Sequence, residues 1–187
     1  MKKIPTLFVR DPENMSRVLP EYHPACAWVR AGEGVATRKY DGTCVMLDAD
    51  GIWWARREVK PGKRAPEGYV AVEVDEVTGK TMGWEPAIAS AFFKYLSEAV
   101  GPRWAHRPLG TYELVGPKIN GNPEGASEHI LIAHASARDL PDAPRAFDEL
   151  DIYLGKTEIE GIVWHHPDGR MAKIKRRDFG HHWGAAR

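Results

Sequence analysis

The stretch ATRKYDGTCVMLDADGIWWARRE, residues 36–58, predicts a β-hairpin with an unusual lysine at its mouth. Both arms are rich in β-branched and aromatic residues, and the DADG between them is a typical turn sequence. Lys39 stands two residues before Asp41 and Gly42. A lysine on a strand is ordinarily a solvated charge, so the role of Lys39 depends on what the rest of the chain brings to it.

The stretch EIEGIVWHHPDGRMAKIKRRDF, residues 158–179, predicts a second hairpin that turns at PDG. Lys173 and Lys175 are two residues apart, so they share one strand face, while Ile174 points the other way toward a core. Glu160 heads the partner strand, and Ile162 is expected to share its face. Lysines and carboxylates gathered in one pocket suit the activation of a nucleoside triphosphate, because cations neutralise phosphate oxygens and a carboxylate holds a metal or a ribose hydroxyl.

The remaining sequence indicates an α+β fold of mainly antiparallel sheets with flanking helices. Apolar residues at helical spacing predict a helix over 84–102, with Pro86 in its first turn and an apolar stripe that begins at Ile88. The other expected elements are strands over 109–116 and 129–135, a helix over 143–155 that stops at Gly155, and loops over 60–69 and 117–125.

The bulk composition indicates a soluble globular protein. Its 187 residues fit one domain, and 43% hydrophobic with 28% charged residues is a globular balance. Lys+Arg and Asp+Glu number 26 each, but a basic stretch from Trp164 to the C-terminus suggests an anionic partner. No segment approaches the roughly 20 apolar residues of a membrane span. Cys26 and Cys44 form no CxxC pair, so we expect buried free thiols and a cytoplasmic, reducing location.

Four short motifs stand in order along the chain: KYDG (39–42), TYELVG (111–116), EGIVW (160–164) and KIK (173–175). Together they resemble those of the covalent nucleotidyltransferases, the superfamily of ATP-dependent DNA and RNA ligases and mRNA capping enzymes. KYDG (39–42) resembles the nucleotidyl-lysine motif KxDG, and TYELVG (111–116) resembles the third motif, which centres on a glutamate. EGIVW (160–164) is similar to EGxV, and KIK (173–175) to KxK. One KxDG alone is a weak signal, whereas four motifs in order over residues 36–177 are a strong one. The likeness is greatest to the small 5′-to-3′ RNA ligases, which share KxDGT, RRE and a basic Pro/Gly loop.

This resemblance implies a single minimal nucleotidyltransferase domain over 1–187, of the ATP-grasp-like ligase adenylation type. About a dozen residues follow Lys175, which implies that there is no OB domain. The implied activity is that of an ATP-dependent RNA ligase that uses Mg²⁺, with Mn²⁺ as an alternative. Lys39 forms lysyl-AMP, the AMP passes to an RNA 5′-phosphate, and that end is joined to a 3′-hydroxyl. An unidentified protein partner could supply the missing domain.

The resemblance also implies a role for each motif residue. Lys39 is the nucleophile, and nearby cations favour its neutral amine. Glu160 is the metal ligand, and Lys173 and Lys175 neutralise phosphate. The other expected nucleotide contacts are Asp41, Gly42, Arg56 or Arg57, Glu113 at a ribose hydroxyl, and Ile162 at the adenine. Lys118 and Asn120 are either substrate contacts or ordinary loop residues.

Other interpretations remain open at this point. Each motif residue alone is more simply a solvated strand charge. A DNA nick ligase or another AMP transferase would use the same motifs, and a non-catalytic nucleotide- or RNA-binding module could share the fold. The complete set of Lys39, Glu113, Glu160, Lys173 and Lys175 favours catalysis over such a module. The histidine pairs of HHP and HHW predict no zinc site, because adjacent residues lie on opposite strand faces.

Overall fold

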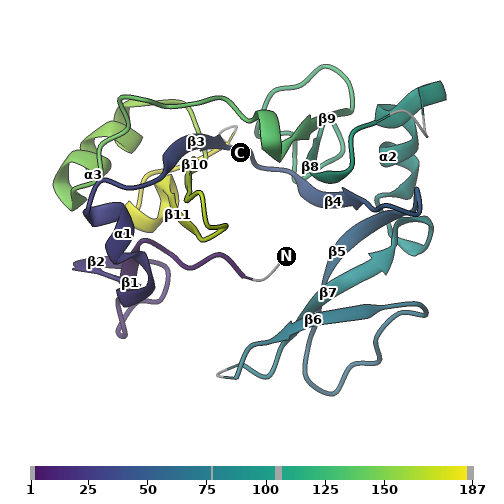
Figure 1. Ribbon diagram of the computed structural model, residues 1–187, viewed down its shortest axis with the longest axis horizontal. Helices are drawn as coiled ribbons and strands as arrows, with labels where there is room; N and C mark the ends of the chain where they lie inside the picture. Colours follow the sequence, from purple (N-terminus) through teal and green to yellow (C-terminus); the bar gives the residue numbers. More distant parts are fainter. Residues whose placement is uncertain (1–2, 77, 104–106, 185–187) are drawn as a thin grey trace. The chain divides into compact units, whose positions relative to one another are not determined.

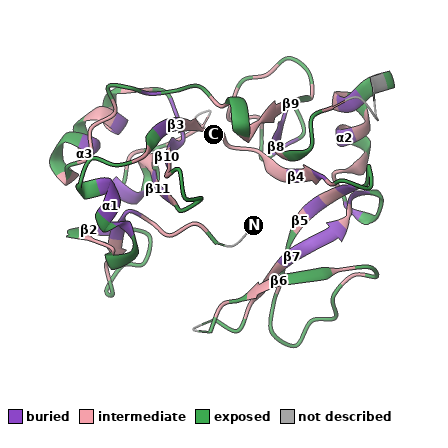
Figure 2. Cartoon of the chain, viewed as in Figure 1, coloured by how far each residue is buried: buried purple, intermediate pink, exposed green. Residues whose placement is uncertain are grey.

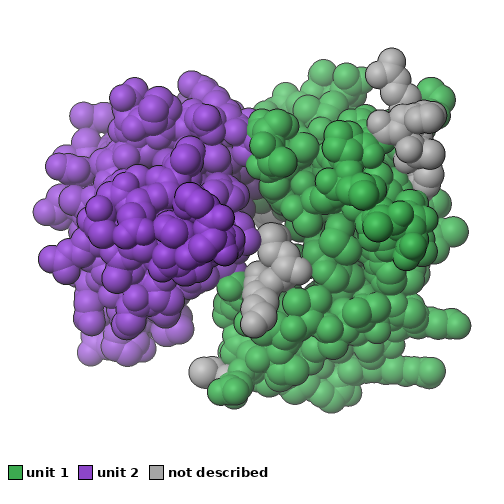
Figure 3. Space-filling model, viewed as in Figure 1, with its two compact units in different colours: residues 1–3, 41–136 green, residues 4–40, 137–187 purple. Residues whose placement is uncertain are grey.

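The computed structural model describes residues 3–76, 78–103 and 107–184, so the Arg187 end of the basic stretch lies outside the described residues. The chain forms two compact units, coloured separately in Figure 3. Unit 1 comprises residues 1–3 and 41–136, and unit 2 comprises residues 4–40 and 137–187. The chain therefore passes from unit 2 into unit 1 between Tyr40 and Asp41, inside the KYDG motif.

Unit 1 is built on a six-stranded antiparallel sheet with the strand order β6-β7-β5-β4-β8-β9 (Figure 1). The helix α2 packs on one face of this sheet, where its Leu96 and Val100 join the buried side chains of β4, β5 and β8. The elements are β4 (Thr43–Leu47), β5 (Trp53–Val59), β6 (Val70–Val74), β7 (Thr81–Pro86), α2 (Phe93–Val100), β8 (Gly110–Val115) and β9 (Ile130–Ala133).

The two faces of the central strands of unit 1 differ in chemistry. Val45, Ala55 and Tyr112 stand opposite one another on β4, β5 and β8, and all three are buried against α2. Full burial of a side chain such as Val45 contributes about 1.5–3 kcal/mol. The alternate residues, among them Cys44 and Glu113, form the opposite face, which we call the Glu113 face.

A carboxylate fixes the turn between β4 and β5. Asp48 Oδ1 accepts hydrogen bonds from the backbone of Asp50 at 3.0 Å and of Ile52 at 2.8 Å. Its Oδ2 accepts one from the indole of Trp54 at 2.7 Å, and this bond lowers the pKa of Asp48. The turn expected at DADG is therefore confirmed. The Asp48 carboxylate stays charged because the turn supplies its hydrogen-bond donors.

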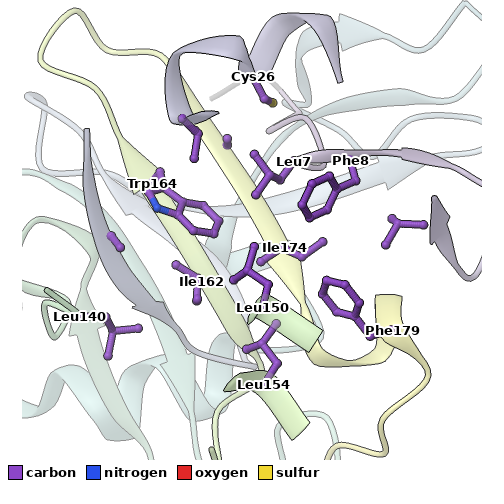
Figure 4. Close-up of a cluster of buried hydrophobic side chains, with 14 of the residues drawn as sticks. Leu7, Phe8, Cys26, Leu140, Leu150, Leu154, Ile162, Trp164, Ile174 and Phe179 are labelled. Atoms are coloured by element: carbon purple, nitrogen blue, oxygen red, sulfur yellow. The ribbon is translucent and has the colours of Figure 1, made fainter. Parts of the chain in front are cut away.

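Unit 2 is built on a three-stranded antiparallel sheet, β11-β10-β3, beside a two-stranded sheet, β1-β2. Its core, shown in Figure 4, brings Ile162 and Ile174 of the larger sheet against Leu150 and Leu154 of α3. The elements are β1 (Phe8–Arg10), β2 (Val18–Tyr22), α1 (Ala27–Arg30), β3 (Val35–Lys39), α3 (Phe147–Lys156), β10 (Gly161–His165) and β11 (Met171–Lys175).

The second predicted hairpin is confirmed, whereas the first was only half right. β10 and β11 pair as expected, and so do β4 and β5. However, the strand expected to run through KYDG is broken: β3 pairs with β10 in unit 2, and β4 pairs with β5 and β8 in unit 1. Lys39 therefore stands on the sheet of the second hairpin and not at the mouth of the first.

The predicted α+β class with mostly antiparallel strands is confirmed, but the helix expected over 84–102 was too long. Residues up to Pro86 belong to β7, and α2 begins only at Phe93. Ile88, placed in the buried stripe, is 74% exposed. The second expected helix continues through Gly155 to Lys156, because this glycine has a helical backbone and does not stop the helix. Within the part of the chain that the structure describes, no helix has the length and apolar character to cross a membrane.

Figure 2 shows that burial varies along the strands: β7 carries a buried stretch, whereas β6 at the edge of the same sheet is mostly exposed or half-buried. Cys26 and Cys44 are both free thiols, as expected. Cys26 is fully buried in the core of unit 2, but Cys44 is only partly buried because it points to the Glu113 face.

Candidate functional site

One face of the three-stranded sheet of unit 2 collects the lysines of the motifs. In the strand register, Gly161 stands between Lys39 and Lys175, and Val163 stands between Thr37 and Lys173. These residues alternate with fully buried ones such as Ile174, which confirms the expectation that Lys173 and Lys175 share a face. We call this surface, made by Thr37, Lys39, Val163, Lys173 and Lys175, the lysine face.

Glu160 joins two strands of the lysine face through its carboxylate. Its Oε2 lies 2.6 Å from Lys39 Nζ, and its Oε1 accepts a hydrogen bond from Lys175 Nζ. Glu160 is only 4% exposed, so solvent screens these ion pairs weakly. Two ammonium groups facing one carboxylate leave one excess positive charge, which favours the binding of an anion such as a phosphate.

Gly161 makes this bridge possible because it has no side chain. A Cβ atom at this position would overlap the carbonyl oxygen of Ile174 and crowd Lys175. Without one, the strands flanking β10 approach closely and Lys39 and Lys175 meet over Gly161. The glycine of EGIVW is therefore a packing requirement of the lysine face.

The structure places Ile162 on the core side of the sheet. Its side chain is fully buried among the residues of the hydrophobic core (Figure 4). The expectation that Ile162 shares a face with Glu160 assumed regular alternation, but Glu160 precedes the first residue of β10 and its side chain reaches over Gly161. Val163 is the residue of this strand on the lysine face, paired with Lys173.

In unit 1, three side chains hold the Asp41-Gly42 turn of the first motif. Glu124 Oε1 accepts a hydrogen bond from Asp41 N at 2.8 Å, and Glu113 Oε1 accepts one from Gly42 N at 3.0 Å. The Asn120 amide donates to Asp41 Oδ1 at 3.1 Å and to Gly42 O at 2.7 Å. Asn120 therefore shapes the motif turn, with a left-handed φ of 49° that asparagine tolerates.

The register separates the two arginines of RRE. Arg56 stands opposite Trp84, and Arg57 stands opposite Gly83. Because Ala55 is on the α2 side, Arg57 is on that side too, where its NH1 lies 4.0 Å from Glu85 Oε1. Arg56 is thus the arginine on the Glu113 face.

One expected residue, Lys118, does not join the other candidate site residues, and three residues that do lie beside them were not expected. Lys118 is exposed, and its backbone N–H donates to His129 Nε2 at 3.3 Å. Val163, Glu124 and His134 were not predicted as site residues. The Nε2 of His134 lies 3.0 Å from Glu113 Oε2. Alternation along the predicted strand 129–135 could have placed His134 on the same face as Ile132. It could not have predicted the contact with Glu113, because the sequence does not give the register between the two strands.

The arrangement of carboxylate, imidazole and thiol side chains limits how a metal ion would bind. Within the described ranges, no three His, Cys, Asp or Glu side chains come together as a metal cluster. Mg²⁺ is commonly held through one or two carboxylates together with substrate phosphates and water. A single buried carboxylate, Glu160, on a lysine-rich face fits that mode of binding.

Comparison with known proteins places this chain among RNA ligases. The sequence profile of RNA ligase 1 matches residues 107–187, which include Glu113, Glu160 and both lysines of KIK. RNA ligase 1 of Danio rerio is 33% identical, over 99% of this chain and 82% of that protein. The chain belongs to the RNA ligase 1 family. RNA ligase 1 of Pongo abelii is 43% identical over 39% of this chain and 25% of its own length. RNA ligase 1 of Rattus norvegicus is 28% identical over 80% of this chain and 68% of its own length.

Proposed function

We propose that this chain is an ATP-dependent RNA ligase that works through a lysyl-AMP intermediate on Lys39. The observation that carries the proposal is the buried Glu160 carboxylate between the ammonium groups of Lys39 and Lys175. Membership of the RNA ligase 1 family supports a ligase whose substrate is RNA. The motif likeness to covalent nucleotidyltransferases supplies the chemistry.

In the first step, the amine of Lys39 attacks the α-phosphorus of ATP. A P–N bond forms, the bond to the β-phosphate oxygen breaks, and pyrophosphate leaves. The amine must lose its proton before it attacks, and Glu160 Oε2, at 2.6 Å, is placed to accept it. The cations of Lys173 and Lys175 stabilise the charge on the phosphate oxygens and favour the neutral amine of Lys39.

A metal ion would bind at Glu160. Bound there, Mg²⁺ or Mn²⁺ would neutralise charge on the triphosphate. Both Glu160 oxygens contact lysine ammonium groups in the structure, and this carboxylate is the residue that would hold the metal ion.

The motif likeness implies further nucleotide contacts for residues of unit 1. Glu113 would accept a ribose hydroxyl, and Arg56 would contact the ribose or the phosphates from the same sheet face. Asp41 and Gly42 would form the backbone beside the nucleophile, held in shape by Asn120. In unit 2, Val163 would pack against the adenine, since Ile162 is used by the core. The AMP would then pass to an RNA 5′-phosphate, and attack by a 3′-hydroxyl would release it.

The decisive experiment is the intact mass of the purified chain after incubation with ATP and Mg²⁺. A gain of one AMP by the wild type, absent from Lys39→Ala but present in Lys63→Ala, is the expected result. Lys63 is an exposed loop lysine and serves as the matched control. Incubation of the adduct with 5′-phosphorylated RNA and with nicked DNA then identifies the acceptor. AMP transfer to DNA alone would replace the RNA ligase by a DNA ligase, and no adduct with ATP or GTP would favour a non-catalytic binding module.

A further inference from the structure

His134 is anchored against Glu113 in unit 1, outside every motif of the sequence. Its Nε2 lies 3.0 Å from Glu113 Oε2, and its Nδ1 lies 2.9 Å from Thr111 Oγ1. Thr111 and Glu113 are two residues apart on β8 and so share one face of the sheet. The strand β9 ends at Ala133, opposite Tyr112, so His134 follows at the place where one imidazole can span both partners.

The two partners determine how the imidazole must be protonated. An ionised carboxylate only accepts hydrogen bonds, so the Nε2 of His134 must donate to Glu113. The hydroxyl of Thr111 can donate or accept, so it satisfies Nδ1 in either protonation state of the ring. His134 therefore donates to Glu113 whether the imidazole is neutral or charged.

Glu113 is consequently held at both carboxylate oxygens. Oε1 accepts from Gly42 N at 3.0 Å, and Oε2 accepts from His134. Rotation of the carboxylate would break both bonds, and the side chain is only 11% exposed, so water replaces them poorly. An ionised carboxylate has about four acceptor positions, so each oxygen keeps one position for a ligand.

We propose that His134 is a positioning residue that orients Glu113 toward the ribose of the bound nucleotide. This inference rests on the proposed function, in which Glu113 accepts a ribose hydroxyl. His134 fixes the plane of the carboxylate, so that its remaining acceptor positions meet the sugar at a set angle. It thereby determines how strongly the protein distinguishes ATP from an analogue that lacks that hydroxyl.

The test measures the rate of AMP adduct formation with Mg²⁺ and ATP, 2′-deoxy-ATP or 3′-deoxy-ATP over a range of nucleotide concentrations. The wild type is expected to prefer ATP over at least one deoxy analogue. In His134→Ala that preference should fall about 10-fold, mainly through a higher KM for ATP, because the lost bond orients a charged acceptor. The rate with the disfavoured analogue should change little.

Four further variants separate positioning from folding. Glu113→Gln should reduce the same preference, and the double variant with His134→Ala should lose no more than the larger single effect. His134→Gln should recover part of the preference, since its amide can donate to Glu113. Thr111→Val removes only the hydrogen bond at His134 Nδ1, so it should reduce the preference for ATP by less. This variant tests the contact between His134 and Glu113 if His134→Ala does not fold. Melting temperatures of all variants identify a purely structural effect.

The outcomes distinguish this inference from the proposed function. Equal losses with ATP and with both analogues in His134→Ala, or an unchanged preference in a folded His134→Ala, would overturn the positioning role and leave the lysyl-AMP chemistry standing. Absence of an adduct in the wild type would overturn the proposed function and the role of His134 with it.

Discussion

The ammonium group of Lys39 lies 2.6 Å from a carboxylate oxygen of Glu160, a residue 121 positions later in the chain. The other oxygen of the same carboxylate binds Lys175. In the proposed reaction the nucleophile is thus held by the residue that would receive the metal. Nucleophile, metal ligand and phosphate-binding lysine are linked through one side chain, so a change at Glu160 should affect all three.

Glu160→Gln should lower both stability and activity. The amide cannot neutralise two ammonium groups, so we expect the free energy of unfolding to fall by about 1–3 kcal/mol, less than for a fully buried ion pair because both lysines are partly exposed. Urea denaturation of the variant measures this change. Adding Lys175→Met should recover part of the loss, and an unchanged unfolding free energy in Glu160→Gln would contradict a stabilising bridge.

Arg56 and Arg57 form a matched pair on opposite sheet faces. Arg56→Ala should slow adduct formation roughly 10-fold or more, because it removes a cation from the Glu113 face. Arg57→Ala should leave that rate close to the wild type, since Arg57 lies on the α2 side beside Glu85. Single-turnover adduct rates measure both variants. The face assignment fails if Arg57→Ala is the more damaging change.

Asn120 and Asn122 form a second matched pair in one loop. Both have a positive φ, 49° and 60°, and both use their side-chain amides in hydrogen bonds. Asn120→Ala and Asn122→Ala should each lose about 1–2 kcal/mol of unfolding free energy. Only Asn120→Ala should also slow adduct formation, because Asn122 bonds to Ala126 and not to the motif turn. Similar adduct rates in the two variants would show that the turn does not need Asn120.

Cys26 should make the protein less stable in alkali. Burial raises the pKa of this thiol from 9.0 to about 11, so the unfolded chain ionises first. The stability that the neutral thiol of Cys26 contributes is complete below pH 9 and is lost as the pH rises toward 11. The difference in unfolding free energy between wild type and Cys26→Val should therefore change over this range.

An alkylating reagent at pH 8 should label the partly buried Cys44 before Cys26, and the reverse order would be inconsistent with the fold.

The sequence was most informative where chemistry and periodicity agreed. Alternation around Ile174 correctly placed Lys173 and Lys175 on one face, because a strand has a strict period of two. The break of the strand after Lys39 could not be predicted, since residues on both sides of KYDG favour strands and a pattern does not reveal which partner each half will choose. Ile162 was misplaced for a related reason: its alternation was counted from Glu160, which lies just outside the strand.

The remaining errors have tertiary causes. Ile88 fits a helical stripe, yet residues up to Pro86 pair with β5, and this sheet contact overrides the local helical preference. His134 carries no motif signal because its role comes from the register of β9 against β8. The sequence therefore predicted the residue types of the candidate site better than the contacts between them.

The division of the chain into two units also has a consequence for its synthesis. Residues 41–136 of unit 1 are continuous, whereas unit 2 needs residues 4–40 and 137–187. Domains generally fold as their residues emerge from the ribosome. The nascent chain can thus assemble most of unit 1 before β10, the strand that pairs with Lys39, has been translated. Lys39 would meet Glu160 only near the end of translation, so a nascent chain arrested before Glu160 would carry the first motif without this ion pair.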